Sequence, residues 1–357
     1  MKKWGLMLAL GLGVLPIAAC SGGPGASTSS GDAAEGGVAA GPSTLQTVLD
    51  RGSLVCGVDG GIPGFSFVED GEYSGLDVDV CKAVASALFD DPEAVEYRNL
   101  DSTERFEALK GGEVDMLSRN TTWTLSRDTS VGMEFAPTTF YDGQGMLVRE
   151  AEALAELTDL EGKSICVETG TTTELNLTDQ MRQAGVSFEP VVFQDADAAY
   201  AAYEEGRCDG MTSDKSQLIA RRSTLSNPDE HVLMDVTMSK EPLGPLTTNN
   251  DSAWFDTVKW VTYALIEAEE LGLTADNIEE TAGSTEDPNI LRFVGAEGTL
   301  GSDMGIPNDF AMRVIKNVGN YGEVFERNLG ADSQFNLDRG QNALWNEGGL
   351  LYSPPFR

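Results

Sequence analysis

Short runs of apolar residues alternate along the chain with stretches in which apolar residues recur at helical spacing. The short runs predict strands over residues 53–58, 95–100, 113–117, 141–148, 163–167 and 187–193. The helical spacing predicts helices over residues 44–51, 76–89, 102–109, 175–184, 195–205 and 252–270. Because strands that alternate with helices are typical of parallel sheets with crossover helices, the pattern predicts an α/β fold.

The order of these elements occurs twice. Each half has a strand, a Gly-rich or polar loop, a helix, a strand, a helix and a strand introduced by G-x-x-D, at residues 112–115 and 206–209. We therefore expect two similar lobes, joined by crossings near residues 148–151 and 241–246. Lobe 1 is predicted from residues 43–148 plus 245–284, lobe 2 from 149–244, and a helical extension packed on lobe 1 from 285–357.

Four loops of this pattern follow predicted strands, at residues 59–65, 118–127, 168–173 and 212–215. Ligands of such sheets bind outside the carboxyl ends of the strands, so the loops are expected to converge on one cleft. Loop 118–127 contains two arginines among Asn and Thr side chains, and loop 212–215 contains Asp214. An arginine and an aspartate on opposite sides suit the carboxylate and the ammonium group of a zwitterion. The alternative is that these are solvated charges beside a capped helix start.

The N-terminal segment predicts export. Residues 1–19 combine two lysines, an apolar run and a small-residue cleavage site, which is the pattern of a signal peptide. Cys20 follows Ile-Ala-Ala as in a bacterial lipobox, which predicts acylation of its thiol; the alternative is an ordinary signal peptide with an incidental cysteine. Residues 20–42 are rich in Gly, Ser and Ala and predict a flexible tether.

Charge and cysteine content limit the partners. A net charge of −34 argues against a nucleic-acid partner and requires any anion site to be local. The four cysteines after Cys20 allow three disulfide pairings, and their separation into an early and a late pair favours Cys56–Cys81 and Cys166–Cys208. A metal site is the alternative, but the chain has one histidine, His231, and no close C-x-x-C pair, so we expect no metal and no cofactor.

Several sequence blocks resemble the solute-binding proteins of polar amino acid ABC transporters, the bacterial extracellular solute-binding protein family 3. The similarity is greatest to general L-amino-acid and glutamate/glutamine/aspartate/asparagine receptors, and it extends from about residue 43 to the C-terminus. The blocks are GLDVDVCKAV from residue 75, DMLSRNTTWTLSRD from 115, FYDGQG from 140, ETGTTTELNL from 168, GNYGEVFER from 319 and ALWNEGGLLYSPPFR from 343.

The resemblance implies a two-lobed type II periplasmic-binding-protein fold and a set of ligand contacts. Arg127 would bind the ligand α-carboxylate, with Thr122 and Asn120 beside it. Thr172, with Thr171, would meet the same carboxylate from the start of a helix in lobe 2, and Asp214 would bind the α-ammonium group.

Two departures from the family pattern bear on selectivity. Relatives commonly stack the ligand between aromatic side chains, where this chain has Gly61, Ile62 and Ser102, so we expect a roomier and more polar pocket. Arg119 replaces a serine of many relatives and would favour ligands with acidic or amide side chains. The alternative for Arg119 is a salt bridge to a rim carboxylate such as Asp142.

The resemblance further implies an extracytoplasmic receptor that delivers polar L-amino acids to the permease subunits of an ABC transporter with a cytoplasmic ATPase. We expect a monomer that is attached to a membrane only through the lipid predicted at Cys20. Two alternatives use the same fold: an amino-acid sensor for a signalling receptor, and an enzyme of the cyclohexadienyl dehydratase type. Acid–base catalysis requires a proton-transferring group in the cleft. His231 lies outside the four cleft loops and is expected to face solvent, so we predict a receptor and not an enzyme.

Overall fold

The computed structural model describes residues 43–357. The predicted signal peptide (1–19), the lipidation site Cys20 and the tether (20–42) lie outside the described residues. No helix within the described part is long and apolar enough to cross a membrane.

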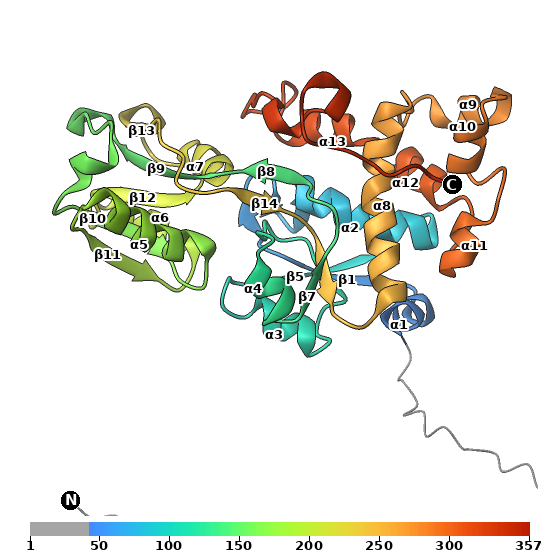
Figure 1. Ribbon diagram of the computed structural model, residues 1–357, viewed down its shortest axis with the longest axis horizontal. Coiled ribbons are helices and arrows are strands. Elements are labelled where there is room, and N and C mark those ends of the chain that lie inside the picture. The colour runs from blue at the N-terminus through green and yellow to red at the C-terminus, as the bar shows by residue number, and fades with distance from the viewer. Residues whose placement is uncertain (1–42) are drawn as a thin grey trace, which may run out of the picture. The chain divides into compact units, whose positions relative to one another are not determined.

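Lobe 1 is built on a five-stranded sheet with the strand order β5-β1-β6-β15-β7 (Figure 1). Its strands are β1 (Leu54–Val58), β5 (Val95–Asn99), β6 (Met116–Leu117), β7 (Met133–Phe135) and β15 (Leu246–Thr248). β1 pairs in parallel with β5 and β6, whereas β15 is antiparallel to β6 and β7. The sheet is therefore mixed, because the strand that returns from lobe 2 enters it in the opposite direction.

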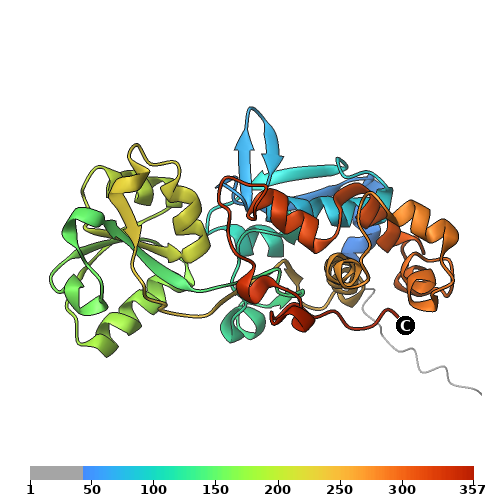
Figure 2. The same cartoon turned by 90° about the horizontal axis from the view of Figure 1, so that it is seen from above.

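A small antiparallel sheet follows β1, where the sequence predicted only a loop and a turn. It consists of β2 (Gly61–Ile62), β3 (Ser66–Glu69) and β4 (Glu72–Ser74), and the blue hairpin in Figure 2 is formed by β3 and β4. Gly75, which follows β4, has φ 124°, and an added Cβ would lie 2.2 Å from the carbonyl oxygen of Phe65. Glycine is required there because no larger residue fits between the hairpin and the next helix.

Lobe 2 contains a second five-stranded sheet with the order β11-β10-β12-β9-β13. Its strands are β9 (Gln144–Arg149), β10 (Ser164–Glu168), β11 (Glu189–Phe193), β12 (Gly210–Asp214) and β13 (His231–Leu233), and its helices are α5 (Thr172–Ala184), α6 (Ala196–Glu204) and α7 (Lys215–Arg222). β10 is parallel to β11 and β12, and β9 is antiparallel to β12 and β13. The predicted α/β class is confirmed, with antiparallel strands added at one side of each sheet.

Two strands connect the lobes, β8 (Phe140–Asp142) and β14 (Glu241–Leu243), and they pair antiparallel with each other. The predicted lobe boundary at residue 148 is wrong, because all of β9 pairs within the sheet of lobe 2. The predicted strand 141–148 is divided at Gly143, where an added Cβ would lie 2.7 Å from Cγ2 of Thr237. The first crossing therefore lies at residues 140–143.

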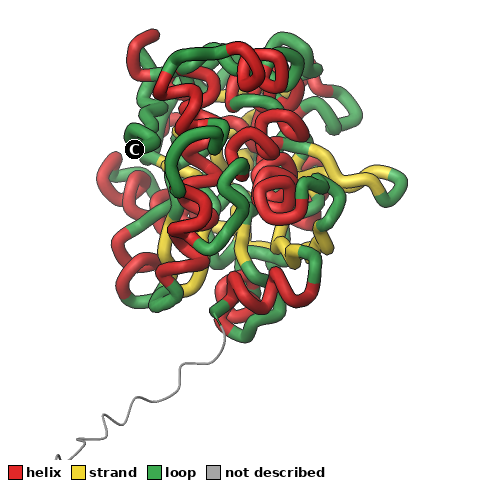
Figure 3. Tube along the Cα trace, turned by 90° about the vertical axis from the view of Figure 1, so that its right-hand side faces the viewer, coloured by secondary structure: helices red, strands yellow, loops and turns green. Residues whose placement is uncertain are grey.

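The helices of the C-terminal extension share one hydrophobic core with lobe 1. Helices α2 (Leu76–Phe89) and α8 (Ser252–Glu270) bury apolar side chains against α12 (Phe310–Val318) and α13 (Tyr321–Asn328). Figure 3 shows the helices in front of the yellow strands. The remaining helices of this part are α1 (Thr44–Arg51), α3 (Arg105–Lys110), α4 (Leu125–Thr129), α9 (Ile278–Ser284), α10 (Pro288–Phe293) and α11 (Leu300–Met304).

Both predicted disulfides are confirmed, one in each lobe. Cys56–Cys81 joins β1 to α2, and Cys166–Cys208 joins β10 to the segment before β12. Each bond therefore fixes a strand that leads to the cleft against its own lobe, and neither bond restricts movement between the lobes.

Candidate functional site

A cavity of about 30 Å³ lies where lobe 1 meets lobe 2. Its lining includes all seven residues that the sequence singled out for ligand binding: Arg119, Asn120, Thr122, Arg127, Thr171, Thr172 and Asp214. The loops at the carboxyl ends of the strands therefore converge as the topology predicted. Their roles in binding remain predictions, and the contacts that each side chain already makes decide which of them is available to a ligand.

Arg127 lies on α4, whose N-terminus is capped by the Thr124 side chain. Its Nη1 donates to the carbonyl oxygen of Thr122 at 2.8 Å, and its guanidinium lies 5.4 Å from the ring centre of Phe106. Burial lowers the pKa of Arg127 to about 10, opposed by nearby carboxylates, so the side chain stays charged at neutral pH. This hydrogen bond orients the guanidinium, and its other N–H groups donate to no further group among the described residues.

Asn120 has its backbone in the left-handed region, with φ 44°. Its N–H donates to the Asp77 carboxylate at 2.8 Å, and the Ser118 hydroxyl lies 3.2 Å from the other carboxylate oxygen. Burial raises the pKa of Asp77 to about 6, although these two hydrogen bonds favour its ionised form. Asp77 therefore holds the loop in place. Asn120 lines the cavity, and its side-chain Nδ2 has no hydrogen-bond partner among the described residues.

Arg119 is held by lobe 1 and contacts lobe 2. Its Nη2 lies 2.5 Å from the Asp59 carboxylate and 3.8 Å from that of Glu168, and its Nε donates to the carbonyl oxygen of Leu100 at 2.8 Å. Arg119 therefore forms the salt bridge that was expected as the alternative, but its partner is Asp59 and not Asp142. Asp142 instead accepts hydrogen bonds from the backbone N–H and the hydroxyl of Ser216.

The two threonines at the start of α5 have different contacts. Thr171 caps the helix: its hydroxyl accepts from the N–H of Glu174 at 3.1 Å and donates to the carbonyl oxygen of Glu168 at 2.7 Å. Thr172 donates to the Glu241 carboxylate at 2.9 Å and lies 3.3 Å from the Thr122 hydroxyl of lobe 1. Thr172 is therefore positioned at the contact between the lobes, whereas the Thr171 hydroxyl is used within its own helix.

Asp214 ends β12 and lines the cavity from lobe 2. Its side chain is buried, and its Oδ1 has no hydrogen-bond partner among the described residues. Burial, and then repulsion from Asp142 and Glu241, raise the pKa of Asp214 well above its usual range. A cation placed beside this carboxylate would favour its ionised form, which is the effect expected of an ammonium group.

Three further charged residues of the site were not among the predicted contacts. Arg105 and Glu168 line the cavity, and Glu241 accepts hydrogen bonds from Thr122 and Thr172 at its edge. Arg105 lies after the carboxyl end of β5. Ligands of such sheets bind outside the carboxyl ends of the strands, so this loop could have been predicted as a fifth part of the cleft. Glu168 belongs to a predicted loop, and Glu241 to the predicted second crossing.

Residues on both sides of the cavity have buried polar atoms without hydrogen bonds, and these atoms are donors on lobe 1 and acceptors on lobe 2. On lobe 1, Nε of Arg105 and Nδ2 of Asn120 are buried donors with no partner among the described residues. On lobe 2, Oδ1 of Asp214 is a buried acceptor with no hydrogen-bond partner there, and Oε1 of Glu168 accepts no hydrogen bond there but lies 3.8 Å from Nη2 of Arg119. Buried polar groups are normally hydrogen-bonded, so a set of this kind complements a ligand that brings acceptors to lobe 1 and donors to lobe 2.

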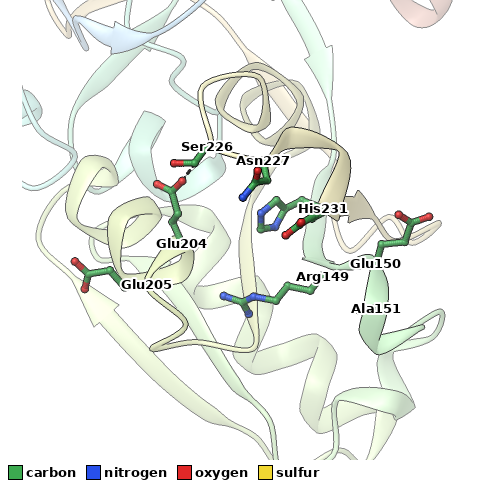
Figure 4. Close-up of a pocket in the computed structure, with 9 residues that line it drawn as sticks. Arg149, Glu150, Ala151, Glu204, Glu205, Ser226, Asn227 and His231 are labelled. Carbon is green, nitrogen blue, oxygen red and sulfur yellow. Dashed lines mark hydrogen bonds between the residues drawn. The ribbon is translucent and has the colours of Figure 1, made fainter.

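A larger cavity, of about 900 Å³, lies within lobe 2 around Arg149 and His231 (Figure 4). Its two central side chains are already paired: Arg149 donates to the carbonyl oxygens of Tyr203 and Cys208, and His231 Nδ1 lies 2.8 Å from the Tyr203 hydroxyl. The prediction that His231 faces solvent is wrong: it begins β13, pairs with β9 and is 8% exposed. Within residues 43–357, no group of His, Cys, Asp and Glu side chains could hold a metal ion.

Comparisons with known proteins point to one family. The model of the bacterial extracellular solute-binding proteins, family 3, matches residues 54–272. The general L-amino acid-binding periplasmic protein AapJ of Rhizobium johnstonii is 50% identical over 91% of this chain and 96% of its own length. The glutamate/glutamine/aspartate/asparagine-binding protein BztA of Rhodobacter capsulatus is 47% identical over 89% of this chain and 95% of its own length.

Solved structures agree with the sequence comparisons. A periplasmic binding protein of an ABC transporter from Brucella ovis, with glutathione bound, is 48% identical and covers 89% of this chain and 100% of its own, with a TM-score of 0.86. An ancestral arginine-binding protein bound to arginine is 26% identical and covers 64% of this chain and 98% of its own, with a TM-score of 0.55. The difference in coverage means that the second structure matches a smaller part of this chain.

Proposed function

Because the chain belongs to the bacterial extracellular solute-binding proteins, family 3, we propose that it captures polar L-amino acids between its lobes and delivers them to an ABC permease. We expect a broad range of ligands, with acidic and amide side chains favoured. The members of this family are solute-binding proteins, in agreement with the prediction of a receptor and not an enzyme. Such receptors act outside the cytoplasm, and acylation of Cys20 would anchor this one, as a monomer, to a membrane.

One observation carries the proposal: the cavity between the lobes has unpaired buried donors on lobe 1 and unpaired buried acceptors on lobe 2. We assign the α-carboxylate of the ligand to Arg127, supported by Thr122 and Asn120. Thr172, with Thr171, approaches the same group from the N-terminus of α5, where N–H groups favour anions. Asp214 receives the α-ammonium group through its unpaired oxygen.

The proposed mechanism is closure of the lobes around the ligand. The carboxylate first binds lobe 1, and the contacts with Asp214 and Thr172 form only when lobe 2 approaches. Because these contacts exist only in the closed arrangement, their free energy shifts the equilibrium towards it. The crossings β8 and β14 are the segments in which the backbone would bend. The closed form would then be recognised by the permease subunits, and the cytoplasmic ATPase would drive import.

Calorimetric titration of the full chain with L-glutamine and L-glutamate tests the assignment. Arg127→Ala and Asp214→Ala should each weaken binding about a hundredfold or more, because each leaves a buried charge of the ligand unpaired. Glu286→Ala, an exposed carboxylate in the C-terminal extension, is the matched control and should bind as the unchanged chain does. Unchanged affinity in either cavity variant would remove the basis of the assignment.

A further inference from the structure

The cavity contains a third arginine in addition to Arg119 and Arg127. Arg105 is the first residue of α3, is 2% exposed and lines the cavity directly. The three guanidinium groups carry three positive charges within one small, largely buried space. The partners of each of them show which charge is left for a ligand.

Two of the three guanidinium groups have identified partners. Arg119 is neutralised within lobe 1 by Asp59 at 2.5 Å and also lies 3.8 Å from Glu168. Arg127 is oriented by the Thr122 carbonyl oxygen and is assigned to the ligand α-carboxylate. Asp214 is assigned to the ligand ammonium group. After these assignments, no further negative charge of an ordinary neutral amino acid remains for Arg105.

Arg105 itself is poorly satisfied. Its Nη1 lies 3.3 Å from the Thr121 hydroxyl, its Nε has no hydrogen-bond partner, and no carboxylate of residues 43–357 lies within 4.0 Å of it. Its guanidinium lies 5.0 Å from the ring centre of Phe106, a contact that offsets only part of the cost of burial. A buried charge without a partner is strongly destabilising, so a structural role alone is a poor explanation for it.

The charges around Arg105 also favour an added negative group beside it. Burial, and then repulsion from Arg119 and Arg127, lower the pKa of Arg105 well below its usual range, and the opposing effects of Glu168 and Asp59 are smaller. An added negative charge near Arg105 would relieve this repulsion. The unpaired Nδ2 of Asn120 lines the same cavity and can donate to the same group.

We propose that Arg105, with Asn120, forms a subsite for a second carboxylate, so that within its range of ligands the receptor binds α-amino acids with an acidic side chain more tightly than those with an amide or an apolar side chain. Arg105 thereby takes the selectivity role that the sequence assigned to Arg119, because Arg119 is already paired with Asp59. The inference rests on the proposed function and extends it from the common part of the ligand to its side chain.

The first part of the test compares two ligands on the unchanged chain. L-Glutamate and L-glutamine have nearly the same shape, but glutamine lacks the second charge. Calorimetry on the full chain should show glutamine binding at least about tenfold more weakly than glutamate, which is the expected loss of one charge-assisted contact. Equal affinities would overturn the subsite.

The second arm assigns the effect to Arg105. Arg105→Gln should weaken L-glutamate at least about tenfold while L-alanine changes by less than about twofold, and Arg105→Lys should restore part of the glutamate affinity. Arg119→Gln is the matched control: it removes the same charge from the same cavity, and we expect it to affect glutamate and alanine alike. A purely structural role of Arg105 would also affect both ligands alike.

The possible failures are distinguishable. Parallel loss of glutamate and alanine binding in Arg105→Gln, or no loss of either, would overturn the subsite and leave the receptor function intact. Binding of neutral amino acids but not of glutamate by the unchanged chain would do the same. Absence of binding of any amino acid by the unchanged chain would instead overturn the proposed function.

Discussion

Asp214 and Asp142 illustrate how single residues set the chemistry of this site. Both are held close to the crossings. Burial and then repulsion from Asp142 raise the pKa of Asp214, whereas burial and, to a smaller extent, repulsion from Glu241 raise the pKa of Asp142 to about 6. Asp142 is satisfied by Ser216 and the N–H of Gly143, whereas Asp214 keeps one unpaired oxygen. The pair therefore consists of one structural carboxylate and one that is available to a cation.

This repulsion predicts a pH dependence of binding. The ammonium group binds the ionised Asp214, so affinity is complete above the pKa of that residue and is lost as the pH falls through it. Asp142→Asn removes a neighbouring negative charge, lowers the pKa of Asp214 and should move this acidic loss of affinity to lower pH. Calorimetry of both proteins between about pH 5 and 8 measures the shift. A shift to higher pH would contradict the proposed role of Asp142.

At the scale of elements, the second crossing links the lobes through more than its backbone. Glu241 of β14 is 1% exposed and accepts from Thr122 of lobe 1 at 2.6 Å and from Thr172 of α5 at 2.9 Å. Asn176, also on α5, donates to its other oxygen at 2.9 Å. One carboxylate on a connecting strand therefore holds the threonines of both lobes side by side.

Glu241→Gln tests this arrangement. Glutamine keeps one acceptor oxygen but places an NH2 group opposite donors, so some of the buried hydrogen bonds must break. The variant should lose about 1–3 kcal/mol of stability, measured by chemical unfolding, and should also bind ligand more weakly. Glu286→Gln on the exposed surface is the control and should change neither property. If the two variants behaved alike, Glu241 would not hold the lobes.

At the scale of the molecule, lobe 1 is larger than a single repeat of the sequence pattern because the extension completes its core. Phe325 of α13 is fully buried, and its ring stacks 6.3 Å from that of Phe140 at the first crossing. Tyr321 of the same helix donates to the carbonyl oxygen of Thr139 at 2.6 Å. The extension therefore supports the base of one crossing, while lobe 2 has its own separate cores.

Phe325→Ala should therefore destabilise one lobe selectively. Removal of a fully buried aromatic ring costs about 3–5 kcal/mol through lost burial and the cavity left behind. Hydrogen exchange should accelerate for the amides of β1 in lobe 1 and stay unchanged for those of β10 in lobe 2. Equal acceleration in both lobes would show that the lobes unfold as one unit and that the cores are not independent.

The sequence by itself determined the features that depend on local pattern. Apolar periodicity located most strands and helices, and the repeated element order indicated two lobes. Strand direction then placed four loops at one cleft, because parallel strands end at the same edge of a sheet. The division of the cysteines into an early and a late pair gave both disulfides, since each pair lies within one repeat.

Only the tertiary structure decided which side chains meet across long distances in the chain. Gly143 divides a single apolar run between a crossing and lobe 2, because Thr237 packs where a Cβ would lie. Asp59 neutralises Arg119, whereas Arg105 has no carboxylate partner among residues 43–357, although both arginines line one cavity. The spacing of residues along the chain shows that a charged side chain follows a strand. Its partner lies on a distant segment, and the packing of that segment decides whether the two side chains meet. The sequence therefore located the cleft, and the fold determined which of its arginines is already paired with a carboxylate.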